Sequence, residues 1–133
     1  QRYALAPTMK LLGTPSQVLI DYTQLDCFGN FYMAVVYDDL GIMAQYGGKV
    51  QSKDGNMLIC PSADAMTEFS LFLTTPDSEV EWDRQMQGCY PGCAPVSLED
   101  ASGIQPDIFY QTYVNQDTTA CYKVREELGV WCP

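Results

Sequence analysis

Short apolar runs separated by turn residues recur along this chain and predict a mainly β protein. The most distinct run, residues 31–37, reads FYMAVVY and is rich in the β-branched and aromatic residues that are enriched in strands. Further strands are expected over residues 17–22, 42–46, 49–52, 57–60, 68–75, 80–82 and 108–114. Because these segments are short and turn residues separate them, the pattern favours an antiparallel β-sandwich with little helix.

Glycine and small polar residues predict where these strands end. Asp54 and Gly55 favour a tight hairpin, because both tolerate the positive φ angles that such a turn requires. Residues 38–41 predict a second turn, and Gly47 and Gly48 are expected to end the strand that precedes them. The strands are therefore expected to be joined mostly by short connections.

Signals for helices are few. Ser97 is a candidate N-cap for one helical turn that Gly103 ends. Residues 3–12 have a mixed pattern that Pro7 interrupts, so an extended N-terminal arm is expected there.

Two segments fit more than one structure. Residues 62–73 fit either a helix or a strand, and we favour a strand from Glu68 onwards. Residues 118–128 fit a short helix that ends at Gly129, whereas residues 121–124 fit the end of a strand equally well.

The length and charge of the chain restrict its partners. Its 133 residues are enough for one domain with a real core. Seven basic residues against seventeen acidic ones leave a net charge of −10, which repels nucleic acid phosphates and anionic lipid. No apolar run is long enough to cross a membrane. The charge would attract a basic protein, although it would also serve solubility alone.

The cysteine and histidine content restricts the disulfides, metal sites and catalytic mechanisms that this chain can have. An even number of cysteines in a short chain favours disulfides and an oxidising, extracellular compartment; the six are Cys27, Cys60, Cys89, Cys93, Cys121 and Cys132. A zinc site is disfavoured, because no CxxC pair and no histidine occur. Without histidine, a Ser-His-Asp or Cys-His nucleophile cannot be built, and no pattern selects a pair of carboxylates for glycoside hydrolysis. We therefore expect a protein that is not an enzyme and needs no cofactor.

A strictly alternating acidic segment is the main candidate contact site. In a strand, the carboxylates of Asp77, Glu79, Glu81 and Asp83 would share one face, with Trp82 on the other. Three interpretations remain open. The face could be a solvated edge that prevents aggregation, it could contact lysines and arginines of a partner, or it could hold Ca²⁺.

Aromatic residues extend this candidate surface. Tyr32, Tyr37 and Tyr46 could line an apolar sheet face that a partner covers. Trp82 would anchor an interface if it were exposed. Packing in the core and at its rim is the competing interpretation.

Several features follow one another in a recognisable order. Cys27 precedes the strand with alternating apolar residues, Cys60 follows the predicted hairpin, and the apolar run 69–73 leads to a third cysteine. The segment IFYQT then places Tyr110 on a strand, ahead of Cys121. This arrangement resembles the ZP-N domain, the N-terminal half of the zona pellucida module of egg-coat proteins.

The resemblance has consequences for fold and disulfides. It covers roughly residues 25–123 and implies a ZP-N-like, immunoglobulin-like β-sandwich domain over residues 25–133, with Tyr110 as a structural signature. Residues 1–24, expected as an N-terminal extended arm or strand, have no counterpart in the family. The resemblance also implies that the first cysteine pairs with the fourth and the second with the third. Carried over, this gives Cys27–Cys121 and Cys60–Cys89, with Cys93–Cys132 as an extra bond; Cys60–Cys93 with Cys89–Cys132 is the alternative.

The resemblance also implies a function. An isolated acidic ZP-N domain is similar to the repeats of vitelline-envelope receptors for lysin, a strongly basic sperm protein. The expected role is non-catalytic recognition of a lysin-like partner, and of other egg-coat modules, in the egg coat during fertilisation. The alternatives are a secreted β-barrel carrier of small molecules or lipid, and a secreted effector or inhibitor.

Overall fold

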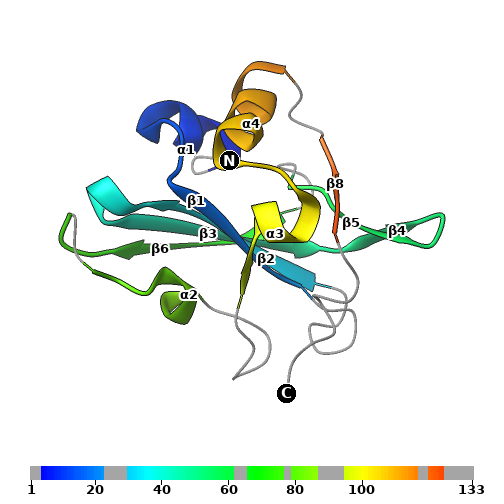
Figure 1. Ribbon diagram of the computed structural model, residues 1–133, viewed down its shortest axis with the longest axis horizontal. Coiled ribbons are helices and arrows are strands. Elements are labelled where there is room, and N and C mark those ends of the chain that lie inside the picture. Colours follow the sequence, from blue (N-terminus) through cyan, green and yellow to red (C-terminus); the bar gives the residue numbers. More distant parts are fainter. Residues whose placement is uncertain are drawn as a thin grey trace.

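Two antiparallel sheets form the framework of the molecule (Figure 1). The computed structural model describes residues 4–22, 30–61, 66–76, 79–86, 95–116 and 120–124. The larger sheet has the strand order β6-β3-β2-β1-β7, with β1 Gln17–Tyr22, β2 Asn30–Tyr37, β3 Ile42–Lys49, β6 Met66–Leu73 and β7 Val96–Ser97. The smaller sheet has the order β4-β5-β8, with β4 Gln51–Lys53, β5 Asn56–Ile59 and β8 Tyr122–Lys123. The predicted fold class, mainly β with antiparallel sheets and a disulfide, is confirmed.

Short helices cover both faces of the larger sheet. Figure 1 places α1 and α4 over one face and α2 against the other. The helical segments are α1 Leu5–Leu12, the 3₁₀ turn η1 Asp38–Leu40, α2 Trp82–Gln85, α3 Leu98–Ser102, α4 Pro106–Gln111 and the π-helical turn η2 Thr112–Gln116. The larger sheet is therefore the central layer of the domain.

The core consists of two apolar clusters, one on each face of this sheet. Side chains alternate along β2, so Met33 and Val35 belong to the cluster beneath α1 and α4, whereas Ala34 and Val36 belong to the cluster beneath α2. Because β2 is buried on both faces, its sequence is a continuous apolar run instead of an alternating one.

Most of the predicted strands and turns are confirmed. The strands expected at 17–22 and 31–37 are β1 and β2, and the strand favoured after residue 68 is the end of β6. Asp54 and Gly55 have φ angles of 53° and 78°, as the predicted hairpin requires. Ser97 caps α3 by accepting a hydrogen bond from the Asp100 amide, and α3 ends at Gly103. Of the two structures open for residues 121–124, the strand is the one observed, as β8.

The extended N-terminal arm is wrong for residues 5–12, which form α1. Pro7 is the third residue of this helix, where the missing N–H has no intrahelical partner to lose. Leu5 and Met9 lie on one helix face and are buried in the same cluster as β2. Residues from the predicted arm are thus part of the central core.

The strand predicted over 108–114 is also wrong, because this segment is helical in α4 and η2. Pro106 starts α4 at a position where its missing N–H costs little. Phe109 and Tyr113 are four residues apart, so a helix turns both into the core, where their ring centroids are 5.2 Å apart. Tertiary packing overrides the strand preference of aromatic residues here.

The prediction that Gly47 and Gly48 end their strand is wrong as well. β3 continues to Lys49, and its pairing with β6 shifts register between the two glycines. Both glycines pair with β2 on the other side, opposite Tyr32 and Phe31. Hydrogen-bonded neighbours on both sides hold this segment extended, and a bulge takes up the irregularity.

Candidate functional site

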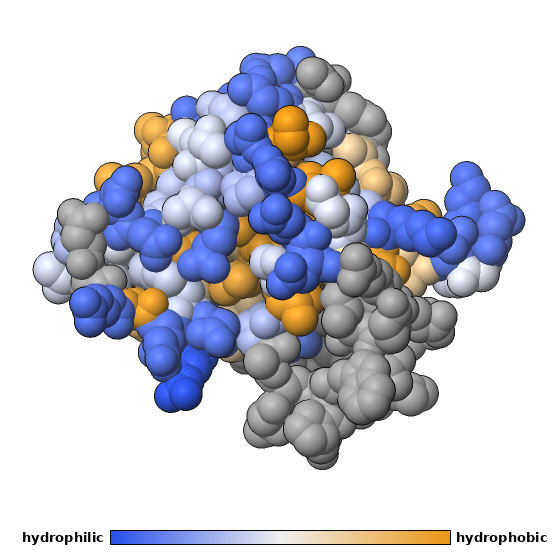
Figure 2. Space-filling model, in the orientation of Figure 1, coloured by the Kyte–Doolittle hydropathy of each residue, from blue (hydrophilic) through white to orange (hydrophobic). Residues whose placement is uncertain are grey.

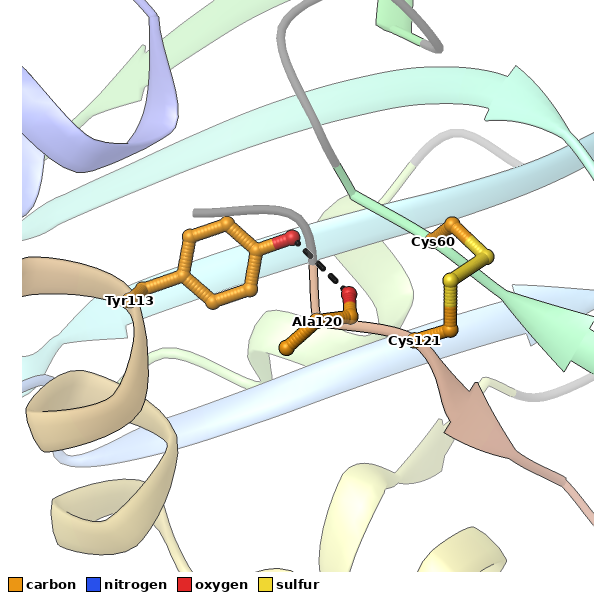
Figure 3. Close-up of a disulfide and its surroundings, with 4 residues drawn as sticks. All are labelled: Cys60, Tyr113, Ala120 and Cys121. Carbon is orange, nitrogen blue, oxygen red and sulfur yellow. Dashed lines mark hydrogen bonds between the residues drawn. A yellow bond between two sulfur atoms is a disulfide. The ribbon is translucent and has the colours of Figure 1, made fainter. Parts of the chain in front are cut away.

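A disulfide between Cys60 and Cys121 joins β5 to β8 (Figure 3). The two cysteines lie one position beyond the Ile59–Tyr122 pair of the ladder. Their Cα atoms are 4.1 Å apart, close to the spacing of directly opposed, non-hydrogen-bonded residues. Cys60 is only 3% exposed, whereas Cys121 is exposed. Beside the bond, the Tyr113 hydroxyl donates to the Ala120 carbonyl over 3.3 Å.

This disulfide corrects the pairing carried over from the ZP-N family. Cys60 and Cys121 bond to each other, so the predicted pairs Cys27–Cys121 and Cys60–Cys89 are both wrong, as is the alternative Cys60–Cys93. The reason is topological, since β8 pairs with β5 and this brings the two cysteines face to face. The remaining four cysteines, Cys27, Cys89, Cys93 and Cys132, lie outside the described residues.

The predicted strand of four carboxylates is not formed. Asp77 lies outside the described residues, and Trp82–Gln85 form helix α2. Glu79, Glu81 and Asp83 are exposed beside this helix. They therefore do not project from one strand face, although they remain at one end of the molecule.

Trp82 is a core residue and not an exposed interface anchor. It is 3% exposed, and its ring packs edge-on against Phe72 with centroids 5.8 Å apart. Its Nε1 donates a hydrogen bond to a carboxylate oxygen of Asp38 in η1. Burial of a tryptophan with its N–H satisfied in this way is favourable, and it fixes α2 to the sheet.

Tyr37 is likewise buried, and it attaches α1 to the sheet instead of lining a free surface. Its hydroxyl donates to the Gly13 carbonyl over 2.9 Å, and Tyr46 donates to Thr8 Oγ1 over 3.1 Å. Burial raises the pKa of both phenols, and for Tyr37 the nearby Tyr46 and Tyr110 raise the pKa further.

The other two predicted aromatic residues have modest exposure. Tyr32 is half-buried against the cluster beneath α2. Tyr110 is half-buried on α4 and packs against the opposite cluster. The prediction of Tyr110 as a strand tyrosine is therefore wrong, while its packing against the core is observed.

The largest exposed apolar side chains of the larger sheet lie on β6, one of its two edge strands. Leu71 is 52% and Leu73 is 63% exposed. They pair with Ala44 and Ile42 of β3, and alternation places them on the same face as Phe69, whose ring lies 5.2 Å from that of Tyr46. We call Ile42, Phe69, Leu71 and Leu73 the β6 edge surface.

An acidic rim lies on the opposite face of β6 from these leucines, on the side of Phe72. We define this rim as Asp39, Glu79, Glu81 and Asp83, which come from η1 and the α2 segment. The Trp82–Asp38 hydrogen bond and the Trp82–Phe72 ring contact hold η1, α2 and β6 together. Figure 2 shows apolar and hydrophilic side chains next to each other at this end of the molecule.

The charge of this rim is only partly neutralised. Arg84 pairs with Glu81 at 2.8 Å, and both side chains are exposed. In the described part of the chain, the other three rim carboxylates have no ion pair within contact distance. An exposed pair of this kind contributes little to stability. The rim therefore keeps a negative field on the Phe72 side of the edge strand β6.

Neither a metal cluster nor a membrane-spanning helix is found among the described residues. Within these ranges, no group of three or more histidine, cysteine, aspartate or glutamate residues is arranged to hold a metal ion. No helix in the described part of the chain combines the length and apolarity that a membrane-spanning helix needs.

The sequence did contain a signal for the β6 edge surface. Phe69, Leu71 and Leu73 are two residues apart, so a strand places them on one face, although the apolar Phe72 on the other face interrupts a strict alternation of apolar and polar residues. The pattern cannot show that this strand is outermost, because strand order depends on pairing with distant segments. The exposure of Leu71 and Leu73 follows from that position and was not predicted.

Comparison with known proteins gives no match to this chain among protein-family models, curated proteins or solved structures. Its function must therefore be argued from its own residues.

Proposed function

We propose that this protein is a non-catalytic, extracellular recognition domain that binds a basic protein at the β6 edge surface. The observation that carries the proposal is the exposure of Leu71 and Leu73 on β6, one of the two edge strands of the larger sheet, with the acidic rim on the other face of the same strand. Solvent-exposed apolar side chains on an edge strand invite association with another chain.

The two parts of this surface have different roles. Burying a leucine fully contributes about 1.5–3 kcal/mol, so covering the exposed half of Leu71 or Leu73 is worth about 1 kcal/mol each. The rim and the net charge of −10 attract a cationic partner over about 10 Å at moderate salt. The leucines thus supply affinity, and the carboxylates supply selection and a faster encounter.

The disulfide supports the extracellular location in this proposal. A cross-link between β5 and β8 with one exposed cysteine persists in an oxidising environment and is rare in reducing ones. The bond thus supports an extracellular location for the domain.

The core does not favour a carrier. Between the larger sheet and the helices that cover it, the space is filled by Met9, Phe31, Phe109 and Tyr113, each at most 2% exposed. A carrier of small molecules or lipid would need an interior cavity at such a place.

In its narrowest form, the proposal places this domain in an egg coat, where a lysin-like basic sperm protein would be the partner. This form rests on the ZP-N resemblance and on the acidic charge. One feature that carried the resemblance, the strand around Tyr110, and one consequence of the resemblance, the disulfide pairing, are contradicted. The broader proposal, a basic partner at β6, is independent of both features.

Titration calorimetry against a panel of basic proteins, including basic proteins purified from sperm, tests the proposal at low and high salt. We expect binding that weakens with salt and that falls about 10-fold or more when Leu71→Ser and Leu73→Ser are combined. Ile108→Ser is the matched control, since Ile108 is 50% exposed on α4. If no basic protein binds the wild type at either salt, or if the control weakens binding equally, the proposal is wrong.

A further inference from the structure

On the side of β6 that faces away from β3, backbone N–H and C=O groups of β6 are available to pair with another strand. The Thr74 amide donates to the Gly41 carbonyl over 2.8 Å, so the backbone groups of Thr74 point towards β3. In an antiparallel ladder this direction alternates with every residue. The N–H and C=O groups of Leu71 and Leu73 therefore point away from β3, and no strand in the described part of the chain pairs with them.

We propose that the basic partner binds as an added β-strand, and that its bound segment alternates apolar and cationic residues. This inference rests on the proposed function and specifies its mode of binding. Strand addition draws affinity from main-chain hydrogen bonds and specificity from alternate side chains. β6 is suited to it, because its outward backbone groups and its exposed leucines belong to the same residues, Leu71 and Leu73.

The two faces of β6 differ, and this is why apolar and cationic residues should alternate along the partner's bound segment. Side chains on one face of an added strand would lie beside Leu71 and Leu73, so apolar residues fit there. The other face lies on the side of Phe72, which contacts Trp82 of α2, where the rim residues Glu79, Glu81 and Asp83 are exposed. Lysine or arginine fits that side. The partner is thus a cationic, amphipathic strand.

A second copy of this chain is a poorer occupant of the same edge. Pairing β6 with β6 would bring together two acidic rims on molecules that each carry a net charge of −10. Like charges across an association surface oppose binding. The charge of the rim therefore selects a cationic strand over self-association.

The probe for the test is a short peptide of alternating valine and lysine, compared with one of alternating valine and glutamate. A third peptide keeps the valine-lysine sequence but carries N-methyl groups on two adjacent central residues. It loses one hydrogen-bond donor from each edge while it keeps its charge and side chains. Binding is followed by calorimetry, and exchange of the Leu71 and Leu73 amides is followed by NMR on the intact protein.

We expect the valine-lysine peptide to bind and to slow exchange of both amides, and the glutamate peptide not to bind. N-methylation should weaken binding about 10-fold or more. If the methylated peptide binds equally well and amide exchange is unchanged, strand addition is wrong while basic recognition stands. If no basic peptide and no basic protein binds, both proposals fail. If the free protein is instead a dimer, and if Leu71→Pro makes it monomeric, a second copy of this chain is the strand that pairs with β6.

Discussion

Replacing Cys60 and Cys121 together by alanine removes the cross-link between β5 and β8 and leaves the other four cysteines unchanged. The bond joins residues with a sequence separation of 61. The chain-entropy relation for a loop of that length gives about 4 kcal/mol of stabilisation at room temperature. Cys60 is buried, so alanine also removes packing and adds about 1 kcal/mol of destabilisation.

Chemical denaturation followed by tryptophan fluorescence measures this change. We expect the free energy of unfolding to fall by about 4–5 kcal/mol and the Tm to fall by about 15 °C. Such a loss is a large part of the total stability of an ordinary domain. Lys123→Ala is the control, because Lys123 is exposed on the same strand β8 and its replacement should change stability by about 0.5 kcal/mol or less.

Two results would refute this reasoning. A loss below about 1 kcal/mol would mean that the cross-link does not constrain the unfolded chain as the loop length requires. Peptide mapping of the intact protein that joins Cys60 or Cys121 to any other cysteine would remove its basis.

Two further predictions concern the buried phenols and a glycine turn. Burial raises the pKa of Tyr37 and Tyr46 above the value in the unfolded chain, so the stability that these phenols contribute is fully present below about pH 10 and is lost as the pH rises further. The free energy of unfolding, measured from about pH 9 upwards to about pH 11, should therefore depend less on pH in Tyr37→Phe and in Tyr46→Phe than in the wild type. An unchanged dependence on pH would contradict this prediction. Gly41→Ala should destabilise by about 2 kcal/mol or more in thermal denaturation, since φ is +66° and a Cβ would lie 2.4 Å from the Thr74 carbonyl oxygen. Gly103→Ala shares the positive φ but meets nothing within 4 Å, so it should cost only about 1 kcal/mol, and equal losses would show that the contact is unimportant.

Local sequence was sufficient where neighbouring residues alone set the conformation. Asp54 and Gly55 form the predicted hairpin because their own backbone preferences favour positive φ. Ser97 and Gly103 bound α3 through hydrogen bonds to residues within four positions. β2 is predicted by its composition, since a run of β-branched and aromatic residues suits a strand that is buried on both faces.

Tertiary structure decided the elements whose conformation depends on distant packing. Residues 108–114 are rich in strand-forming side chains, yet the segment is helical, because a helix brings the rings of Phe109 and Tyr113 into contact with each other in the core. Residues 5–12 form a helix for a similar reason, since Leu5 and Met9 bury one face against the larger sheet. Propensity is a weak preference that such burial exceeds.

For the disulfide and the β6 edge surface, too, the sequence predicts some properties and the tertiary structure decides others. Six cysteines and a net charge of −10 are properties of the sequence, and they predict disulfides and a preference for cationic partners. The pairing of β8 with β5 decides that Cys60 meets Cys121. The pairing of β6 with β3 alone, among the described strands, makes β6 an edge of the larger sheet. These pairings join residues far apart along the chain, so no local pattern encodes them.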